Sequence, residues 1–318
     1  MGALHQGHLA LIRRAAHENA KVYVSIYVNP AQFGVSEDLS SYPRTLSEDM
    51  EKLTALNTEL ESDKVRSKVA IVFNPATEEL WPTFPPSQEL HGHGAFVNIS
   101  PLGQILEGAS RPVFFRGVTT VCMKLFNLVQ PDNIYLGKKD YQQATLLKLL
   151  VSEFHIPSKI CLIPTIRESD GLAMSSRNVY LGERRRRAAL ILFEAMHAIR
   201  TAWNAGEDDA GLLQKLGMEM IERAQASYLG LPSSQRVRFE TDYLKVVKRA
   251  TMTDYEGKID RTQGAMVVGA LVMHPLEEPQ EGEDRGFGGG IRPVRLIDNI
   301  SLDRSKTEDI TVTLVKPG

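Results

Sequence analysis

Four short runs of β-branched and other apolar residues, each ended by a turn signal, constrain the fold of this chain more than any other feature. The runs are residues 21–28, 70–73, 133–136 and 160–163, and they stop at Asn-Pro, Asn-Pro, Gly and Pro. Such runs are typical of strands buried on both faces. Helical patterns at 118–129 and 141–154 separate the later runs. Strands alternating with helices predict a doubly wound parallel α/β sheet, whose ligands bind beyond the carboxyl ends of the strands.

The second half of the chain has a different pattern. Helical patterns at about 183–205 and 209–229 precede strand-like runs at about 238–247, 264–273 and 294–300. Helices followed by a group of strands indicate a smaller α+β unit. We therefore predict two domains, 1–178 with the ligand-binding edge of the parallel sheet and 179–318 as a lid.

Composition excludes several classes of protein. With 37 basic and 39 acidic residues, the net charge of −2 predicts no nucleic-acid or membrane partner. No apolar run approaches the ~20 residues of a membrane span. Cys122 and Cys161 lie in apolar company, which favours free thiols and a cytoplasmic protein, with organelle targeting as an alternative. The run Arg184–Arg187 is interpreted as a solvated helix face.

The first motif places two histidines at the start of a predicted helix. His5 and His8 stand three residues apart, and Gly2 and Gly7 allow a tight turn and a close approach to a ligand. A helix N-terminus offers free N–H groups and a dipole that favour phosphate. The His-x-Gly-His pattern is typical of enzymes that transfer a nucleotidyl group from ATP. The alternative is an ordinary turn with two surface histidines.

Polar residues also follow two of the predicted strands. Asn29 and Gln32 follow the first strand, and Lys139, Asp140 and Gln143 follow the third. The amides can both donate and accept, which suits a ligand with hydroxyls and a carboxylate. Lys139 could bind a phosphate and Asp140 a ribose hydroxyl. Each also has a structural reading, as a solvated turn, a helix N-cap or a strand-ending turn.

A second motif follows the fourth strand, in residues 164–178. Ser175, Ser176 and Arg177 place two hydroxyls and a guanidinium on a short loop. Arginine offers a fixed fork of donors that grips phosphate, and such a loop can stabilise the charge that develops on an α-phosphate. The alternative is that the serines only cap the next helix.

Together these motifs resemble the pantothenate synthetase (pantoate–β-alanine ligase) family of the nucleotidyltransferase superfamily. The resemblance covers nearly the whole chain. The matching segments are MGALHQGH (1–8), VSIYVNPAQFG (24–34), EDLSSYPRT (37–45), SRPVFFRGV (110–118), LVQPDNIYLGKKDYQQ (128–143), PTIRESDGLAMSSRN (164–178), DYLKV (242–246) and RLIDNISL (295–302).

The resemblance implies roles for individual residues. The implied catalytic residues are His5, His8, Lys139, Ser175, Ser176 and Arg177. The implied ATP-binding residues are these six with Met1, Gly7, Gly137, Asp140, Ile166 and Met174. The implied pantoate-binding residues are Asn29, Gln32, Tyr42, Arg111 and Gln143.

The resemblance also implies a reaction in two steps. Pantoate and ATP give pantoyl-adenylate and pyrophosphate, and β-alanine then displaces AMP to give pantothenate. Mg²⁺ would be held mainly by the ATP phosphates, with Asp49 as a weak candidate to assist. A homodimer is expected. Two alternatives stay open: another His-x-Gly-His adenylyltransferase, or a truncated, inactive homologue that acts only as a dimerisation partner.

The chain departs from the family pattern in several places. Family members carry a strand and a Pro-Thr pair ahead of the segment that begins at Met1, so we expect the chain without them to be poorly soluble or inactive. Phe114 replaces a histidine beside Arg111, and Lys138 replaces a glutamate. Residues 57–68 and 275–292 are predicted to be exposed insertions.

Overall fold

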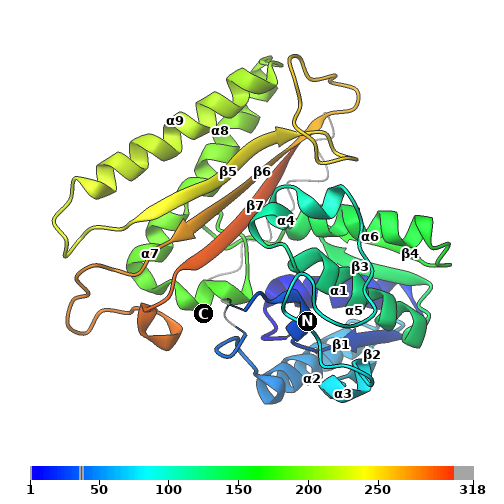
Figure 1. Ribbon diagram of the computed structural model, residues 1–318. Coiled ribbons are helices and arrows are strands. Elements are labelled where there is room, and N and C mark those ends of the chain that lie inside the picture. The colour runs from blue at the N-terminus through cyan, green and yellow to red at the C-terminus, as the bar shows by residue number, and fades with distance from the viewer. Residues whose placement is uncertain (1, 36, 38, 304–318) are drawn as a thin grey trace. The chain divides into compact units, whose positions relative to one another are not determined.

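The computed structural model describes residues 2–35, 37 and 39–303, and the chain divides into two compact units after Ile163 (Figure 1). This division falls earlier than the boundary expected after Asn178. A buried ion pair explains the difference, because Arg167 Nη1 lies 2.6 Å from Asp298 Oδ2 in the last strand. The segment that carries the second motif therefore folds with the second unit.

The first unit consists of short parallel strands and their helices. In chain order these are α1 (Gln6–Glu18), β1 (Val22–Ser25), η1 (Pro30–Gln32), α2 (Leu46–Ser62), β2 (Val69–Phe73), α3 (Thr77–Leu80), η2 (Leu102–Gln104), α4 (Glu107–Ser110), α5 (Phe114–Val129), β3 (Asn133–Gly137), η3 (Lys138–Asp140), α6 (Tyr141–Glu153) and β4 (Lys159–Ile163). Strand β1 pairs with β2 and β3 with β4, both in parallel. The four predicted strands and their parallel class are confirmed.

Alternating side chains of β1 build the core beneath the first motif. Val22 and Val24 are buried, whereas Tyr23 between them is 47% exposed. The buried pair packs with α1 and with Leu53 and Leu56 of α2 in one apolar cluster. Helix α1, which carries both histidines, is thus fixed against β1 and α2 by apolar burial.

The second unit is an antiparallel sheet with helices. Its elements are η4 (Ser176–Tyr180), α7 (Gly182–Ala189), α8 (Ile191–Ala205), α9 (Ala210–Leu229), β5 (Phe239–Val247), β6 (Ala265–Met273), η5 (Phe287–Gly290) and β7 (Val294–Leu302). The sheet order is β5-β6-β7, and α8 and α9 lie along one face of it (Figure 1). The predicted α+β class is confirmed. Throughout the described part of the chain, no helix combines the length and apolarity that a membrane span requires.

The interpretation of the arginine run in α7 as a solvated face is wrong for two of its four members. Arg185 is 1% exposed and Arg184 is 8% exposed. Arg185 donates to the Leu181 carbonyl at 2.9 Å and to the Arg292 carbonyl at 3.0 Å. Arg184 Nε donates to Glu283 Oε1 at 2.7 Å. These two guanidiniums hold the predicted exposed insertion 275–292 against α7.

The other predicted insertion, 57–68, is also partly built into the fold. Helix α2 continues through it to Ser62, and Leu60 is 2% exposed in the core. The Asn57 side chain accepts from the Val69 N–H at 2.9 Å and donates to the Val69 carbonyl at 3.2 Å. It thereby fixes the start of β2.

Candidate active site

The two histidines of the first motif interlock at the start of α1. His5 is the N-cap residue, and its Nδ1 accepts from the Gly7 N–H at 3.1 Å. His8 Nδ1 accepts from the His5 N–H at 3.3 Å. The two ring centroids lie 4.0 Å apart. The imidazoles therefore take the capping role that Ser or Asp usually plays.

Both imidazoles are neutral near pH 7. Burial, and then the positive charge of Lys139, lower the pKa of His5 to about 4. Burial, and then His5, hold the pKa of His8 well below its usual range. A neutral imidazole whose Nδ1 accepts a hydrogen bond carries its proton on Nε2. Each ring thus presents an Nε2–H donor beside a helix N-terminus, without a net charge of its own.

Asp49 has a structural role in place of the metal-assisting role predicted for it. Its side chain is 0% exposed on α2. Oδ2 accepts from the Ala3 N–H at 2.9 Å, and Oδ1 accepts from the Leu4 N–H at 2.6 Å and the Thr45 hydroxyl at 3.3 Å. Both oxygens are occupied by the loop that leads into the motif. Among the described residues, no group of three or more His, Cys, Asp or Glu could hold a metal.

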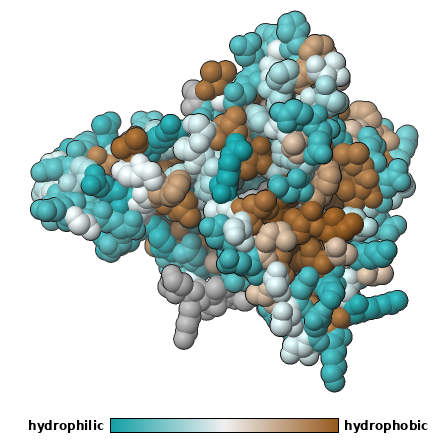
Figure 2. Space-filling model, turned by 90° about the horizontal axis from the view of Figure 1, so that it is seen from below, coloured by the Kyte–Doolittle hydropathy of each residue, from teal (hydrophilic) through white to brown (hydrophobic). Residues whose placement is uncertain are grey.

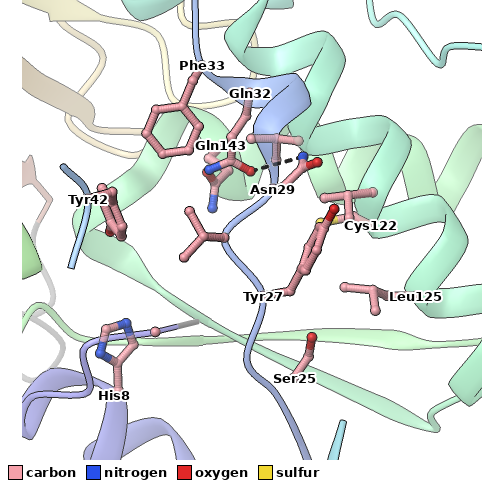
Figure 3. A pocket seen from close by; sticks show the side chains of 14 residues that line it. His8, Ser25, Tyr27, Asn29, Gln32, Phe33, Tyr42, Cys122, Leu125 and Gln143 are labelled. Carbon is pink, nitrogen blue, oxygen red and sulfur yellow. Dashed lines mark hydrogen bonds between the residues drawn. The ribbon is translucent and has the colours of Figure 1, made fainter. Parts of the chain in front are cut away.

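A cavity of about 220 Å³ lies where β1 ends, and four of the five residues predicted to bind pantoate line it (Figure 3). Its polar wall contains Asn29, Gln32, Tyr42 and Gln143, with His8 nearby (Figure 3). The other lining residues are Gly2, Ser25, Tyr27, Val28, Phe33, Val118, Val121, Cys122 and Leu125. The cavity is smaller than the ~300–1,000 Å³ of typical ligand pockets. It suits a small molecule with one polar and one apolar side.

Asn29 fixes the position of the polar wall. Its side chain is 2% exposed, and Nδ2 donates to the Gly117 carbonyl at 3.1 Å and to Gln32 Oε1 at 3.3 Å. A Cβ atom at Gly117 would lie 2.2 Å from the Ala31 carbonyl oxygen. Helix α5 and η1 therefore meet through main chain, and only glycine allows this approach.

Arg111 is not among the described residues that line the cavity, although it was predicted to bind pantoate. Its guanidinium pairs with Glu37 at 2.5 Å and donates to the Gln32 carbonyl at 3.3 Å. Its carbon Cζ lies 3.8 Å from the centre of the Phe114 ring. The phenylalanine that departs from the family pattern is thus the surface on which Arg111 stacks. Arg111 therefore contacts the polar wall through the main chain of Gln32.

Three of the residues predicted to bind ATP lie at the end of β3. Gly137 closes the strand, and η3 carries Lys139 and Asp140, whose Nζ and Oδ1 atoms are 3.5 Å apart. Lys139 lies close enough to both histidines for its charge to lower their pKa values. Lys138, the second departure, is 7% exposed. The first motif and the end of β3 therefore form one electrostatic neighbourhood.

The second motif lies in the second unit. The Met174 N–H donates to the Ile166 carbonyl at 3.0 Å, and Arg167 and Ala173 form a β-bridge. Ser175 caps η4, since its Oγ accepts from the Arg177 N–H at 3.3 Å. Ser175 is therefore a helix cap, and its contact with phosphate stays a prediction. Met1, which was predicted to bind ATP, lies outside the described residues.

A family model for pantoate-beta-alanine ligase matches residues 1–301. The chain belongs to the pantoate–β-alanine ligase family. The expectation of an enzyme that ligates pantoate and β-alanine at the expense of ATP is thereby confirmed, and the alternative of a different adenylyltransferase family is not supported.

Individual members of the ligase family agree with this assignment. The chain is 45% identical over 222 residues to pantothenate synthetase of Roseiflexus castenholzii, covering 70% of this chain and 73% of that protein. It is 46% identical over 215 residues to that of Moorella thermoacetica, covering 68% and 69%. The crystal structure of pantothenate synthetase from Thermus thermophilus superimposes with a TM-score of 0.73 at 33% identity, covering 95% and 91% of the chains. The enzyme from Francisella tularensis, complexed with β-γ ATP and β-alanine, gives 0.63 at 30% identity, covering 95% and 87%.

Sequence reasoning missed the apolar wall of the cavity. This wall comes mainly from one face of α5, with Val118, Val121, Cys122 and Leu125 at helical spacing. Burial raises the pKa of the Cys122 thiol to about 12, so it stays protonated and acts as an apolar surface. The spacing was visible in the sequence. It predicted only a helix, since nothing local distinguishes a cavity wall from a packed helix face.

Proposed function

We propose that the first-unit cavity binds pantoate and that the ligation proceeds through pantoyl-adenylate. The observation that carries this proposal is the convergence of Asn29, Gln32, Tyr42 and Gln143 on one small cavity beside His8 (Figure 3). Amide and phenol groups can address both the carboxylate and the hydroxyls of pantoate. The apolar side formed by α5 suits its hydrocarbon part.

The histidines and Lys139 act on the phosphates in this proposal. The Nε2–H donors of His5 and His8 would hydrogen-bond the α-phosphate oxygens as negative charge develops, and Lys139 would add a positive charge. Preorganised donors of this kind are commonly the largest single contribution to catalysis. Asp140 would bind the ribose. Met174, Ser175, Ser176 and Arg177 keep their predicted role as a phosphate-binding loop.

The reaction needs no covalent bond to the protein. A pantoate carboxylate oxygen attacks the α-phosphorus, the bond to the pyrophosphate oxygen breaks, and pyrophosphate leaves. The β-alanine nitrogen then attacks the acyl carbon, the bond to the AMP oxygen breaks, and the amine loses a proton. The chain supplies position and charge stabilisation in both steps.

Mg²⁺ is proposed to arrive with ATP, bound by phosphate oxygens and water, as this ion prefers. Asp49 does not fit a coordinating role because its side chain is fully buried and both of its oxygens accept hydrogen bonds from the protein. In this proposal the described side chains would bind the nucleotide, and the ion would neutralise part of its charge.

The test is the formation of AMP and pantothenate from pantoate, β-alanine, ATP and Mg²⁺. Without β-alanine, the adenylate should form once per site and pyrophosphate should appear as a single burst. Release of AMP that depends on both acids supports the proposal. Nucleotide transfer that continues without pantoate would contradict it.

We also propose that the chain forms a homodimer. Tyr23 and Ile71 face each other across β1 and β2 and are 47% and 46% exposed. Apolar side chains gather on the face of the molecule seen in Figure 2. Contiguous exposed apolar surface commonly marks an interaction site. Sedimentation of the wild type and of Tyr23→Lys tests this, because a charge in the contact should shift the protein to monomer.

A further inference from the structure

We propose that Asp49 is a positioning residue that fixes the first histidine motif against α2. Only the expected effect on catalysis rests on the proposed function. The buried carboxylate accepts hydrogen bonds from two consecutive backbone N–H groups, those of Ala3 and Leu4, at 2.9 and 2.6 Å. These residues lie 46 and 45 positions away in the chain and lead directly into His5.

A second residue of α2 completes the clamp. Lys52 Nζ donates to the Leu4 carbonyl at 2.7 Å, one helical turn beyond Asp49. Both main-chain polar groups of Leu4 are therefore held by α2. The next N–H, that of His5, is bonded to His8 Nδ1. The main chain from Ala3 to His5 thus has a hydrogen-bond partner at every N–H, and two of the three come from one carboxylate.

The conformation of the loop shows why it needs such a clamp. Ala3 has a φ of 48°, in the left-handed region that residues with a Cβ atom avoid. Strained backbone of this kind persists only where the surroundings over-determine it. Leu4 is 2% exposed and adds apolar anchoring beside the clamp. Without the Asp49 bonds, the loop is free to relax toward an ordinary conformation and to carry His5 with it.

Asp49 also joins the two sides of the site. The Thr45 hydroxyl donates to Asp49 Oδ1 at 3.3 Å, and the Asp49 N–H donates to the Thr45 carbonyl at 2.8 Å. Thr45 lies three residues after Tyr42, which lines the cavity. The same carboxylate therefore holds the loop that leads to the histidines and the segment that leads from the pantoate wall.

Asp49→Asn tests the proposal, with Glu51→Gln as the matched control. An asparagine keeps the size but presents one acceptor and an NH₂ group, so one backbone N–H loses its partner. Glu51 is exposed on the same helix, and its substitution changes the net charge equally. We expect the kcat for AMP formation to fall about 10- to 100-fold in Asp49→Asn, as a misplacement of about 1 Å can cause. Glu51→Gln should stay within about twofold of wild type.

The decisive measurement is the pKa of His5, followed by NMR with labelled histidine. Burial holds this pKa at about 4, with Lys139, Asp140 and Lys52 as the charged groups that also act on it. Removing a negative charge would by itself lower the pKa of a nearby imidazole further. Loosening the loop would instead hydrate the ring and raise the pKa toward 6.5, so a rise in Asp49→Asn reports displacement.

The outcomes separate this proposal from the proposed function. If Asp49→Asn raises the pKa of His5 and loses a ligase activity that the wild type has, both proposals are supported. If Asp49→Asn raises this pKa but the wild type itself has no ligase activity, only the clamp is supported. An unchanged His5 pKa and unchanged kcat in folded Asp49→Asn would overturn the clamp. If Asp49→Asn does not fold, Thr45→Val decides: a smaller change in the same sense supports the proposal, and wild-type values refute it.

Discussion

The two motifs that are proposed to bind phosphate are held in opposite ways. The histidine motif of the first unit is anchored through its main chain, by a buried carboxylate that accepts from Ala3 and Leu4. The serine–arginine motif of the second unit is anchored through side chains on its flank. Arg167 pairs with Asp298 at 2.6 Å, and Arg186 pairs with Asp170 at 2.6 Å. In the first unit a carboxylate fixes backbone N–H groups, whereas in the second unit ion pairs fix the base of a hairpin.

The difference matches what each motif presents. The histidines are neutral, so their proposed action depends on donor direction, which a fixed main chain provides. Arg177 carries its charge at any physiological pH and is partly exposed, so its action depends less on exact direction. Position is therefore secured at the motif itself in the first unit and beside the motif in the second.

The largest expected effect comes from breaking the flank anchor of the second unit. Arg167→Met leaves Asp298 buried without its partner, which commonly costs about 3–5 kcal/mol. We expect a cooperative thermal transition that is lower by roughly 10 °C. Arg187→Met, which removes an arginine that is about two-thirds exposed from α7, should change the melting temperature little. Equal effects of the two substitutions would show that burial of the pair does not matter.

Removing a donor from the first motif should affect turnover more than stability. We expect His8→Ala to reduce adenylate formation by about 10²-fold or more, as loss of one preorganised donor does, and His5→Ala to act similarly. His17→Ala, on the exposed end of the same helix, is the control. Single-turnover pyrophosphate release measures the effect. Wild-type rates in both site variants would remove the histidines from the proposed mechanism.

The amide wall should separate the two substrates. Gln143→Ala should raise the KM for pantoate by about tenfold, roughly the value of one or two lost hydrogen bonds, and leave the KM for ATP nearly unchanged. Gln32→Ala should do the same. Gln142→Ala is the contrast, because Gln142 Nε2 donates to the Leu102 and Ile105 carbonyls at 2.9 and 2.8 Å. It should lower the melting temperature and spare the pantoate KM.

The smallest effect is a pH dependence of stability in the first unit. The folded-state pKa of His5 lies at about 4, below the unfolded value near 6.5, so the unfolded chain binds more protons between them. Stability is fully present above pH 6.5 and is lost as the pH falls toward 4. From about pH 6.5 to about 5.5, His5 contributes a loss of about 1 kcal/mol. His5→Asn should flatten the dependence of melting temperature on pH in this window, and His17→Asn should not.

Local patterns predicted the elements, because runs and spacings of apolar residues decide strands and helices. The same local reading failed where partners are distant in the chain. Arg184 and Glu283 are 99 positions apart, so four consecutive arginines looked hydrophilic although two of them are buried. Asp49 was a candidate to assist Mg²⁺ for the same reason, because its partners Ala3 and Leu4 lie 46 and 45 positions away in the chain.

Identical neighbours show a second limit. Gln142 and Gln143 are adjacent on α6, yet one satisfies buried carbonyls and the other lines the cavity. Successive residues of a helix point about 100° apart, so the roles depend on how α6 is rotated. The sequence indicated the end of the strand and its polar residues. Packing alone decides which amide lines the cavity.

The contact at Gly117 has a consequence for redesign of the substrate range. Because main chain meets main chain where α5 crosses η1, the spacing between these elements has no side chain that could be exchanged to widen it. A larger residue there would push away the segment that carries Asn29 and Gln32. Engineering toward a bulkier or slimmer acid would have to begin on the exchangeable wall, at Val118, Val121 and Leu125. The backbone therefore fixes the polar end of the cavity, whereas the side chains at its apolar end can be substituted.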